Sequence, residues 1–304
     1  MGSNSAQRER PPTFFFPQTL EVSAQSGSSK PPPNTEVQTS SASVKRHSPH
    51  PSRRPGQLVK SQSQAPSIQT STGDPWKEYE KGIEIYPKWK TSLCRSREDR
   101  TELVHIQQLD LERSAAKLEA DTIGLLSHRS FPRLLNCYHH EQHTYFVWEP
   151  TELSLSQIMG SKCTIRESEL VSIVWPVLKG IRYLRDCGRA LASLTNDSIL
   201  FTVSGGVKIA GVGQSCQIDA RDMNAVTMKL FALSDIVREL RKKMDPHDPW
   251  GSDAQNLPEK LTAVPLNDLL RDGLFAQMKE GELKMLVNIA SKTGHYNIKF
   301  PQLH

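Results

Sequence analysis

The stretch that decides the fold runs from Leu178 to Gly213 and reads LKGIRYLRDCGRALASLTNDSILFTVSGGVKIAGVG. Its apolar residues up to Gly188 recur at helical spacing, which predicts a helix that ends there. Two short apolar runs follow, Ile199–Phe201 and Val207–Ile209, with Ser204-Gly205-Gly206 between them. Apolar runs on either side of a glycine-rich turn are typical of a β-hairpin, so we expect two paired strands.

This stretch resembles the catalytic centre of a eukaryotic protein kinase, whose pattern is roughly G-x-x-Y-L-H-S-x-G-I-I-H-R-D-I-K-x-x-N-I-L-L, a turn, and V-K-L-x-D-F-G. The matching positions are scaffold residues: Gly180, Tyr183, Leu184, Gly188, Ile199, Leu200, Val207, Lys208, Ile209 and Gly213. The resemblance covers about residues 79–295, and its last part is similar to the PAK branch of the sterile-20 serine/threonine kinases. It implies an α+β, two-lobed protein kinase-like fold. The reduced N-lobe would take about residues 79–150, and the shortened, mainly helical C-lobe about residues 151–295.

The chemical positions of the family do not match. The resemblance places the catalytic Asp at Ser193, the loop Lys at Thr195, the metal-binding Asn at Ser198 and the Asp of D-F-G at Gly211. Phosphoryl transfer depends on positioned charges and magnesium, which these side chains do not supply. We therefore expect no catalytic residue and no metal site. Asp197 is close enough in sequence to serve one role, although fixing the loop is the simpler interpretation.

The nucleotide pocket of the family is degenerate as well. The Lys that holds the phosphates falls on Gln107, in a strand predicted at Leu103–Gln107. His105 replaces a small residue over adenine and is expected to be a packed core histidine. Trp148 falls at the back of the pocket, and Glu149 and Thr151 fall at its hinge. We expect no cofactor; ATP and magnesium would bind only if the chain is an active serine/threonine kinase with unorthodox residues.

The pattern also predicts several elements of the N-lobe. Tyr86–Lys90 is the first strand candidate, and the interval from Trp89 to Leu103 contains no glycine and looks too short for a phosphate-binding hairpin. Ser114–Ser127 reads as a helix, in which the family's pairing Glu falls on Thr122 or Asp121. Further on, Pro176 is expected to kink the long helix before Gly188 or to end its first half.

Composition divides the chain in two. Of 304 residues with a net charge of +5, residues 1–73 carry eight Lys or Arg and three Asp or Glu, so residues 74–304 are balanced. The first segment is rich in Ser, Pro and Gln and poor in aliphatic residues, which predicts a disordered tail before a kinase-like domain at 74–304. The balanced charge argues against a nucleic-acid partner. The five widely spaced cysteines predict neither a disulfide framework nor a metal site.

These observations favour a catalytically inactive pseudokinase that acts as a scaffold or regulator by protein binding, with an active kinase among the candidate partners. The alternatives are an active kinase with replacement groups and a degenerate remnant without a role. No apolar run reaches the length of a membrane span, and no signal peptide is apparent. We expect an intracellular protein, in the cytoplasm rather than the nucleus. The sequence leaves the oligomeric state open.

Overall fold

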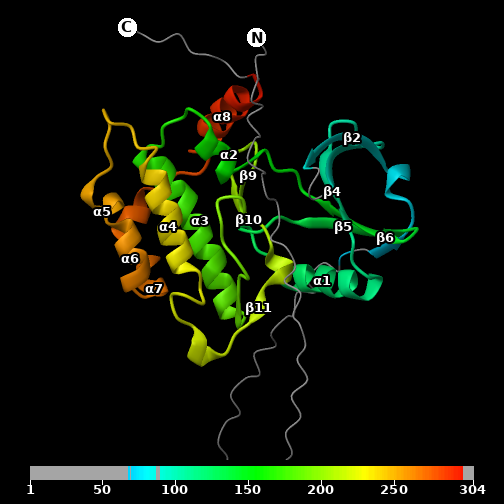
Figure 1. Ribbon diagram of the computed structural model, residues 1–304, viewed down its shortest axis with the longest axis horizontal. Helices are drawn as coiled ribbons and strands as arrows, with labels where there is room; N and C mark the ends of the chain where they lie inside the picture. The colour runs from blue at the N-terminus through cyan, green and yellow to red at the C-terminus, as the bar shows by residue number, and fades with distance from the viewer. Residues whose placement is uncertain (1–67, 69, 87–89, 297–304) are drawn as a thin grey trace, which may run out of the picture. The chain divides into compact units, whose positions relative to one another are not determined.

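A six-stranded sheet and one helix form the first part of the described chain (Figure 1). The computed structural model describes residues 68, 70–86 and 90–296, all within one compact unit. The strands are β1 (Thr70–Thr72), β2 (Tyr79–Tyr86), β3 (Thr91–Ser96), β4 (Leu103–Leu109), β5 (Leu134–His140) and β6 (His143–Trp148). Helix α1 (Arg113–Leu125) connects β4 to β5. The strand order is β1-β5-β6-β4-β3-β2; β1 is parallel to β5, and every other pair is antiparallel.

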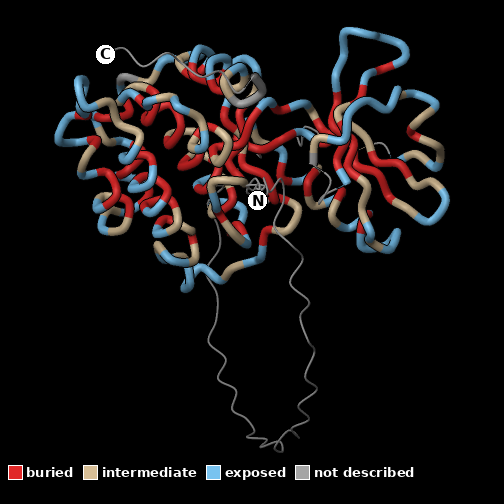
Figure 2. Tube along the Cα trace, turned by 45° about the horizontal axis from the view of Figure 1, so that its top comes forward, coloured by how far each residue is buried: buried red, intermediate tan, exposed pale blue. Residues whose placement is uncertain are grey.

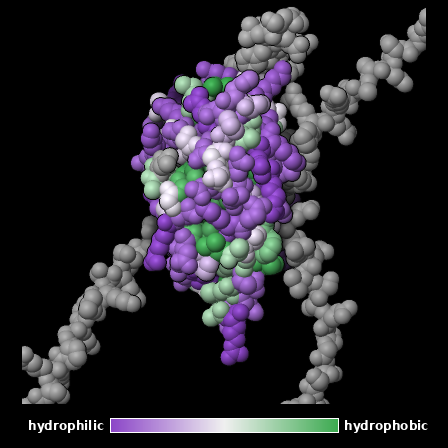
Figure 3. Space-filling model, turned by 90° about the vertical axis from the view of Figure 1, so that its left-hand side faces the viewer, coloured by the Kyte–Doolittle hydropathy of each residue, from purple (hydrophilic) through white to green (hydrophobic). Residues whose placement is uncertain are grey.

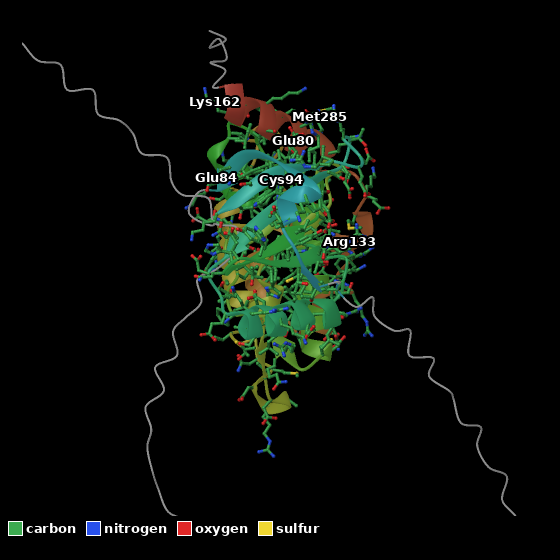
Figure 4. All side chains as sticks on the ribbon, turned by 90° about the vertical axis from the view of Figure 1, so that its right-hand side faces the viewer. Glu80, Glu84, Cys94, Arg133, Lys162 and Met285 are labelled. Atoms are coloured by element: carbon green, nitrogen blue, oxygen red, sulfur yellow. The ribbon has the colours of Figure 1, made fainter. Side chains whose placement is uncertain are left out.

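The sheet buries both of its faces. Side chains alternate along β4, so Val104 and Ile106 point to one face while His105 and Gln107 point to the other. The first face holds a small core, made of Cys94, Val104, Ile106, Tyr138, Tyr145 and Val147. The second face packs against α1 and joins the main core through Phe146 and Trp148. Figure 4 looks onto the sheet and labels Glu80 and Glu84 on β2 and Cys94 on β3.

The second part of the chain is mainly helical. Its helices are α2 (Leu155–Gly160), α3 (Glu167–Asp186), α4 (Leu230–Arg241), α5 (Ser252–Gln255), α6 (Leu257–Ala263), α7 (Leu266–Leu269) and α8 (Lys284–Tyr296). Short strands lie among them: β7 (Leu153–Ser154), β8 (Arg189–Ala190), β9 (Ile199–Phe201), β10 (Val207–Ile209) and β11 (Cys216–Gln217). The remaining turns of helix are η1 (Pro75–Lys77), η3 (Val212–Gln214), η4 (Ala220–Asp222) and η5 (Gly273–Gln277). Figure 2 shows buried residues along the centre of this helical part, and the α+β class is confirmed.

The hairpin expected from the deciding stretch is present. Strands β9 and β10 are antiparallel, with Ile199 opposite Ile209 and Phe201 opposite Val207. All four side chains are buried, which is why the apolar runs made the strands visible in the sequence. Helix α3 ends at Asp186, and Gly188 follows with a φ of 68°. The predicted helix at 114–127 is confirmed as α1, and β5 and β6 follow it.

The first hairpin of the sheet lies earlier than predicted. The expected strand at Tyr86–Lys90 is wrong, because β2 covers Tyr79–Tyr86 and residues 87–89 lie outside the described residues. The interval after Trp89 is also not too short for a hairpin strand, since Thr91–Ser96 forms β3 and pairs with β2. Strand β2 is at the edge of the sheet and has irregular register, so it lacks the buried alternation that identifies a strand in a sequence.

The expectation that Pro176 ends the first half of its helix is wrong, because α3 is continuous from Glu167 to Asp186. A proline inside a helix costs about 3 kcal/mol, chiefly through a lost hydrogen bond and a steric clash. Packing outweighs this cost here, since the adjoining Val174 and Val177 are fully buried. The Ser130 hydroxyl also donates a hydrogen bond to the Pro176 carbonyl at 2.7 Å.

The boundary between tail and domain at residue 73 is wrong by several residues. Strand β1 pairs with β5 in parallel, Thr70 opposite Cys137 and Thr72 opposite His139. Ile68 packs against the main core, beside Gly124 of α1. The rest of the predicted tail, residues 1–67 and 69, lies outside the described residues.

The surface seen in Figure 3 is mostly hydrophilic, with hydrophobic side chains in small separate groups. Of the helices that the structure describes, none has the length and apolar character needed to cross a membrane.

Removing β1 should destabilise the domain. We predict that a fragment 74–304 has a lower melting temperature than a fragment 65–304. The pairing of β1 and the burial of Ile68 should contribute about 1–3 kcal/mol. For a domain of this size, each kcal/mol corresponds to roughly 2–4 °C. Calorimetry of the two fragments and the full chain measures the difference, and equal melting temperatures would show that β1 does not support the sheet.

Candidate functional site

His105, Gln107 and Trp148, which were expected at nucleotide-binding positions, lie close to one another on the paired strands β4 and β6. His105 on β4 lies opposite Trp148 on β6, and Gln107 lies opposite Phe146. The side chains of His105, Gln107 and Trp148 are buried. Their exposed fractions are 4%, 6% and 6%, respectively. The indole Nε1 of Trp148 donates a hydrogen bond to Oε1 of Gln107 at 3.2 Å. The structure therefore brings these residues together as a packed polar contact between strands.

His105 is the buried histidine that the sequence predicted. Burial lowers the pKa of His105 from 6.5 to about 4, because the interior of the sheet disfavours the charged imidazolium. The imidazole is therefore neutral at physiological pH, and it is buried in the interior beside the sheet.

Glu149 and Thr151 follow β6, where the hinge was expected. The Glu149 carboxylate forms an ion pair with Lys208 of β10, at 2.7 Å, and accepts a hydrogen bond from the Arg133 backbone N–H at 3.0 Å. Both side chains of this ion pair are mostly buried, at 19% and 16% exposed. Thr151 is buried, and in the described part of the chain its hydroxyl has no hydrogen-bond partner. Glu149 thus fastens the end of the sheet to the β9–β10 hairpin.

The positions of the expected catalytic loop lie between β8 and β9. Ser198 is buried, and its hydroxyl accepts a hydrogen bond from the Thr195 N–H and donates one to the Thr195 carbonyl, both at 2.9 Å. Thr195 is exposed, while Ser193 and Asp197 are half-buried. Ser198 therefore closes its own loop, as a turn residue does.

Gly211 lies next to this loop. The Ser198 carbonyl accepts a hydrogen bond from the Ala210 N–H at 2.8 Å, which brings the two expected metal-binding positions together. Gly211 has φ 84° and ψ 18°, a left-handed conformation that begins η3. The positions that the resemblance assigns to an amide and a carboxylate are thus a serine and a glycine. No group of three or more His, Cys, Asp or Glu side chains suited to a metal ion occurs in the described part of the chain.

One acidic residue near η3 was missed in the sequence. At the two expected positions, Asp121 is exposed and the Thr122 hydroxyl donates a hydrogen bond to the Leu118 carbonyl of its own helix. Instead, Glu119 reaches η3: a Cβ placed on Gly213 would lie 2.7 Å from the Glu119 Cγ. Burial raises the pKa of Glu119. Helical spacing was the available signal, since Glu119 precedes Thr122 by one turn on nearly the same face.

Three of the cavities among the described residues have volumes of about 750, 880 and 560 Å³. Glu149 lines the first of them, whereas His105, Gln107, Trp148 and Thr151 line none of the three. The side chains expected to hold a nucleotide thus occupy the interior.

A scan against models of protein families found no match to this chain, and a search of curated proteins found no match either. The functional interpretation therefore depends on the residues described above.

The buried His105 should make the protein sensitive to acid. Its folded pKa is below its unfolded pKa of about 6.5, so its contribution to stability is present above pH 6.5 and is lost as the pH falls toward 4. The loss between pH 7 and pH 4 should be about 3 kcal/mol. We predict that His105→Phe removes this part of the pH dependence, because the ring is kept and the titration is lost.

Urea denaturation of wild type and His105→Phe at both pH values measures the effect. The matched control is His143→Phe, which changes a histidine that is only half-buried at the start of β6. The prediction fails if His105→Phe loses as much stability on acidification as wild type does.

Proposed function

We propose that this chain is a kinase-like domain protein of PAK-like descent, a catalytically inactive pseudokinase that acts as a scaffold or regulator by binding other proteins. One observation carries the proposal. The positions that need charges for phosphoryl transfer hold the neutral residues Gln107, Ser193, Ser198 and Gly211, and the structure uses Gln107 and Ser198 for internal hydrogen bonds. These positions act as a unit in catalysis, so their joint replacement is not compensated by one nearby carboxylate.

The architecture is compatible with this proposal. A sheet with one helix precedes a mainly helical part, and the β9–β10 hairpin follows the longest helix, α3. This is the arrangement that the resemblance implies. The main core continues from α1 and the sheet into the helices, which argues against a remnant that cannot fold.

The replacements also have a thermodynamic benefit. A lysine in place of Gln107 would place an ammonium group in the interior of the sheet, beside the indole of Trp148. Burying a charge without a carboxylate partner costs several kcal/mol, whereas the neutral amide is satisfied by the indole N–H. The neutral Gln107 and its bond to Trp148 therefore stabilise the fold. In the proposed function, partners bind at the surface.

The filled pocket leads to a direct prediction for nucleotide binding. A ligand present at one hundred times its dissociation constant stabilises the folded state by about 2.7 kcal/mol. At roughly 2–4 °C per kcal/mol, such binding would raise the melting temperature by about 5–10 °C. We predict no saturable shift of the full chain with millimolar ATP, with or without magnesium. An active kinase in the same assay shows that the method responds.

Phosphotransfer from labelled ATP to a generic basic substrate tests the enzyme alternative, and we expect none above background. If the chain were an enzyme, Asp197 is the carboxylate closest in sequence to the expected catalytic position. Activity that is lost in Asp197→Asn and kept in the exposed control Asp222→Asn would contradict the proposal. Activity that is equal in both variants comes from a contaminating kinase, which leaves the purified chain inactive as proposed.

A further inference from the structure

Three basic side chains lie close together where the loop before β5 meets α3. They are Arg129, Lys179 and Arg182, called the basic cluster below. Arg129 and Arg182 are exposed, and Lys179 is half-buried. Within the described residues, none of the three forms an ion pair, and the one contact of Lys179 is with the ring of Trp175, 4.7 Å away.

The charges of the cluster act on each other. Burial and then the neighbouring Arg129 and Arg182 lower the pKa of Lys179. Burial also lowers the pKa of His128, followed by the positive charges of Arg129, Lys179, Arg182 and Lys208. Of these cations, Lys208 is neutralised by Glu149. The other three repel one another, which is an arrangement that an anionic ligand would relieve.

Arg129 of the cluster lines a cavity of about 560 Å³, whereas Lys179 and Arg182 are outside its lining. Arg129 and Lys208 line it, together with Trp175 and Pro176 of α3 and the β9–β10 turn. Glu280 and Glu282 lie on another part of its lining, next to Lys279, and the Ser168 hydroxyl donates a hydrogen bond to the Glu282 carboxylate. The cavity therefore has a basic side, an acidic side and an apolar wall.

Ser172 gives an independent sign of a ligand. It also lines the cavity, is only 6% exposed, and has a hydroxyl with no hydrogen-bond partner among the described residues. Pro176 lacks an N–H, so it cannot bond to the Ser172 carbonyl four residues earlier. A buried hydroxyl is ordinarily paired, because leaving it unpaired costs free energy. A polar ligand in this cavity would supply the missing partner.

We propose that this cavity and the basic cluster bind a phosphorylated serine or threonine within a segment of a partner protein. Arginine side chains hold phosphate through paired, charge-assisted hydrogen bonds, and Arg129 and Arg182 have their guanidinium groups free for this among the described residues. The apolar wall at Trp175 and Pro176 would take an adjoining side chain. The inference deepens the proposed protein-binding function and rests on it.

Other occupants fit less well. The chain's own first 73 residues carry an excess of positive charge, which the basic cluster repels. An anionic membrane is a flat surface, whereas this site is concave, and Glu280 and Glu282 on its rim would face the lipid phosphates. A nucleic acid needs a wide basic surface, but residues 74–304 have balanced charge. A single phosphate on a peptide matches a small basic side next to an acidic one.

Fluorescence polarisation of the full chain with labelled degenerate peptides tests the proposal. The probes carry a central phosphoserine or phosphothreonine, and the matched library lacks the phosphate. We expect saturable binding that is at least about tenfold tighter with phosphate and weakens with added salt. Arg129→Gln and Arg182→Gln should each weaken it about tenfold, since each removes a hydrogen bond to a charged group.

Three further variants sharpen the test. Arg221→Gln removes an exposed arginine of η4, far from α3 in sequence, and should leave affinity unchanged. Arg129→Lys keeps the charge but loses the paired donors, so its affinity should lie between wild type and Arg129→Gln. Ser172→Ala should weaken binding of the phosphorylated library without lowering the melting temperature, because its hydroxyl has no partner to lose.

Equal binding with and without phosphate would overturn the inference. So would unchanged affinity in Arg129→Gln and Arg182→Gln, or binding only to phosphatidylserine vesicles or single-stranded DNA. These failures are distinguishable from failure of the proposed function. Turnover of ATP would refute the inactive pseudokinase without affecting the peptide titration. If the protein turns over no ATP and also binds no phosphopeptide, only the proposed phosphopeptide site is refuted.

Discussion

At Gly205, the turn between β9 and β10 has no space for a side chain. Gly205 has a φ of 83°, and a Cβ there would lie 2.6 Å from the Lys284 nitrogen and 3.0 Å from the Leu283 carbonyl carbon. The turn thus rests directly on the backbone at the start of α8. At the other end of the hairpin, the Ile209 N–H donates to the Ser130 carbonyl, and Lys208 pairs with Glu149. One hairpin therefore fastens the last helix, the loop before β5 and the end of the sheet.

Under the proposed function, this packing accounts for a kinase-like scaffold that does not depend on the charged side chains of a kinase. The residues that make the hairpin and α3 are held by burial and backbone hydrogen bonds, which do not require charged side chains. The chemical positions lie next to these elements, and neutral residues there satisfy one another, as Gln107 and Trp148 do. Each such hydrogen bond contributes only about 1 kcal/mol, but an unpaired charge in the same place would cost more.

The sequence predicted the elements whose apolar residues are buried in a regular pattern. The β9–β10 hairpin, α3 and α4 are of this kind, and His105 was correctly expected to be a core residue. Prediction failed at β2 and β1, which are edge strands with few buried side chains. Their pairing depends on partners distant in the chain, which local patterning does not reveal.

The same reason hid parts of the candidate sites. Glu119 faces η3 although almost a hundred residues separate the two, and the basic cluster joins a loop residue to two residues of α3. The unpaired hydroxyl of Ser172 is a property of packing, so no spacing rule identifies it. The degenerate chemical positions were visible because they depend on residue identity alone.

The close contact at Gly205 is tested most directly by comparing Gly205→Ala with Gly281→Ala. The two glycines have nearly equal φ angles, 83° and 80°, but nothing lies within 4 Å of a Cβ placed on Gly281. Backbone strain is therefore common to both variants, and only Gly205→Ala adds the clash with Lys284. In urea denaturation, the free energy of unfolding of Gly205→Ala should be about 1–3 kcal/mol lower than that of Gly281→Ala. Equal free energies of unfolding would contradict the hairpin's role as the contact on which the helical part depends.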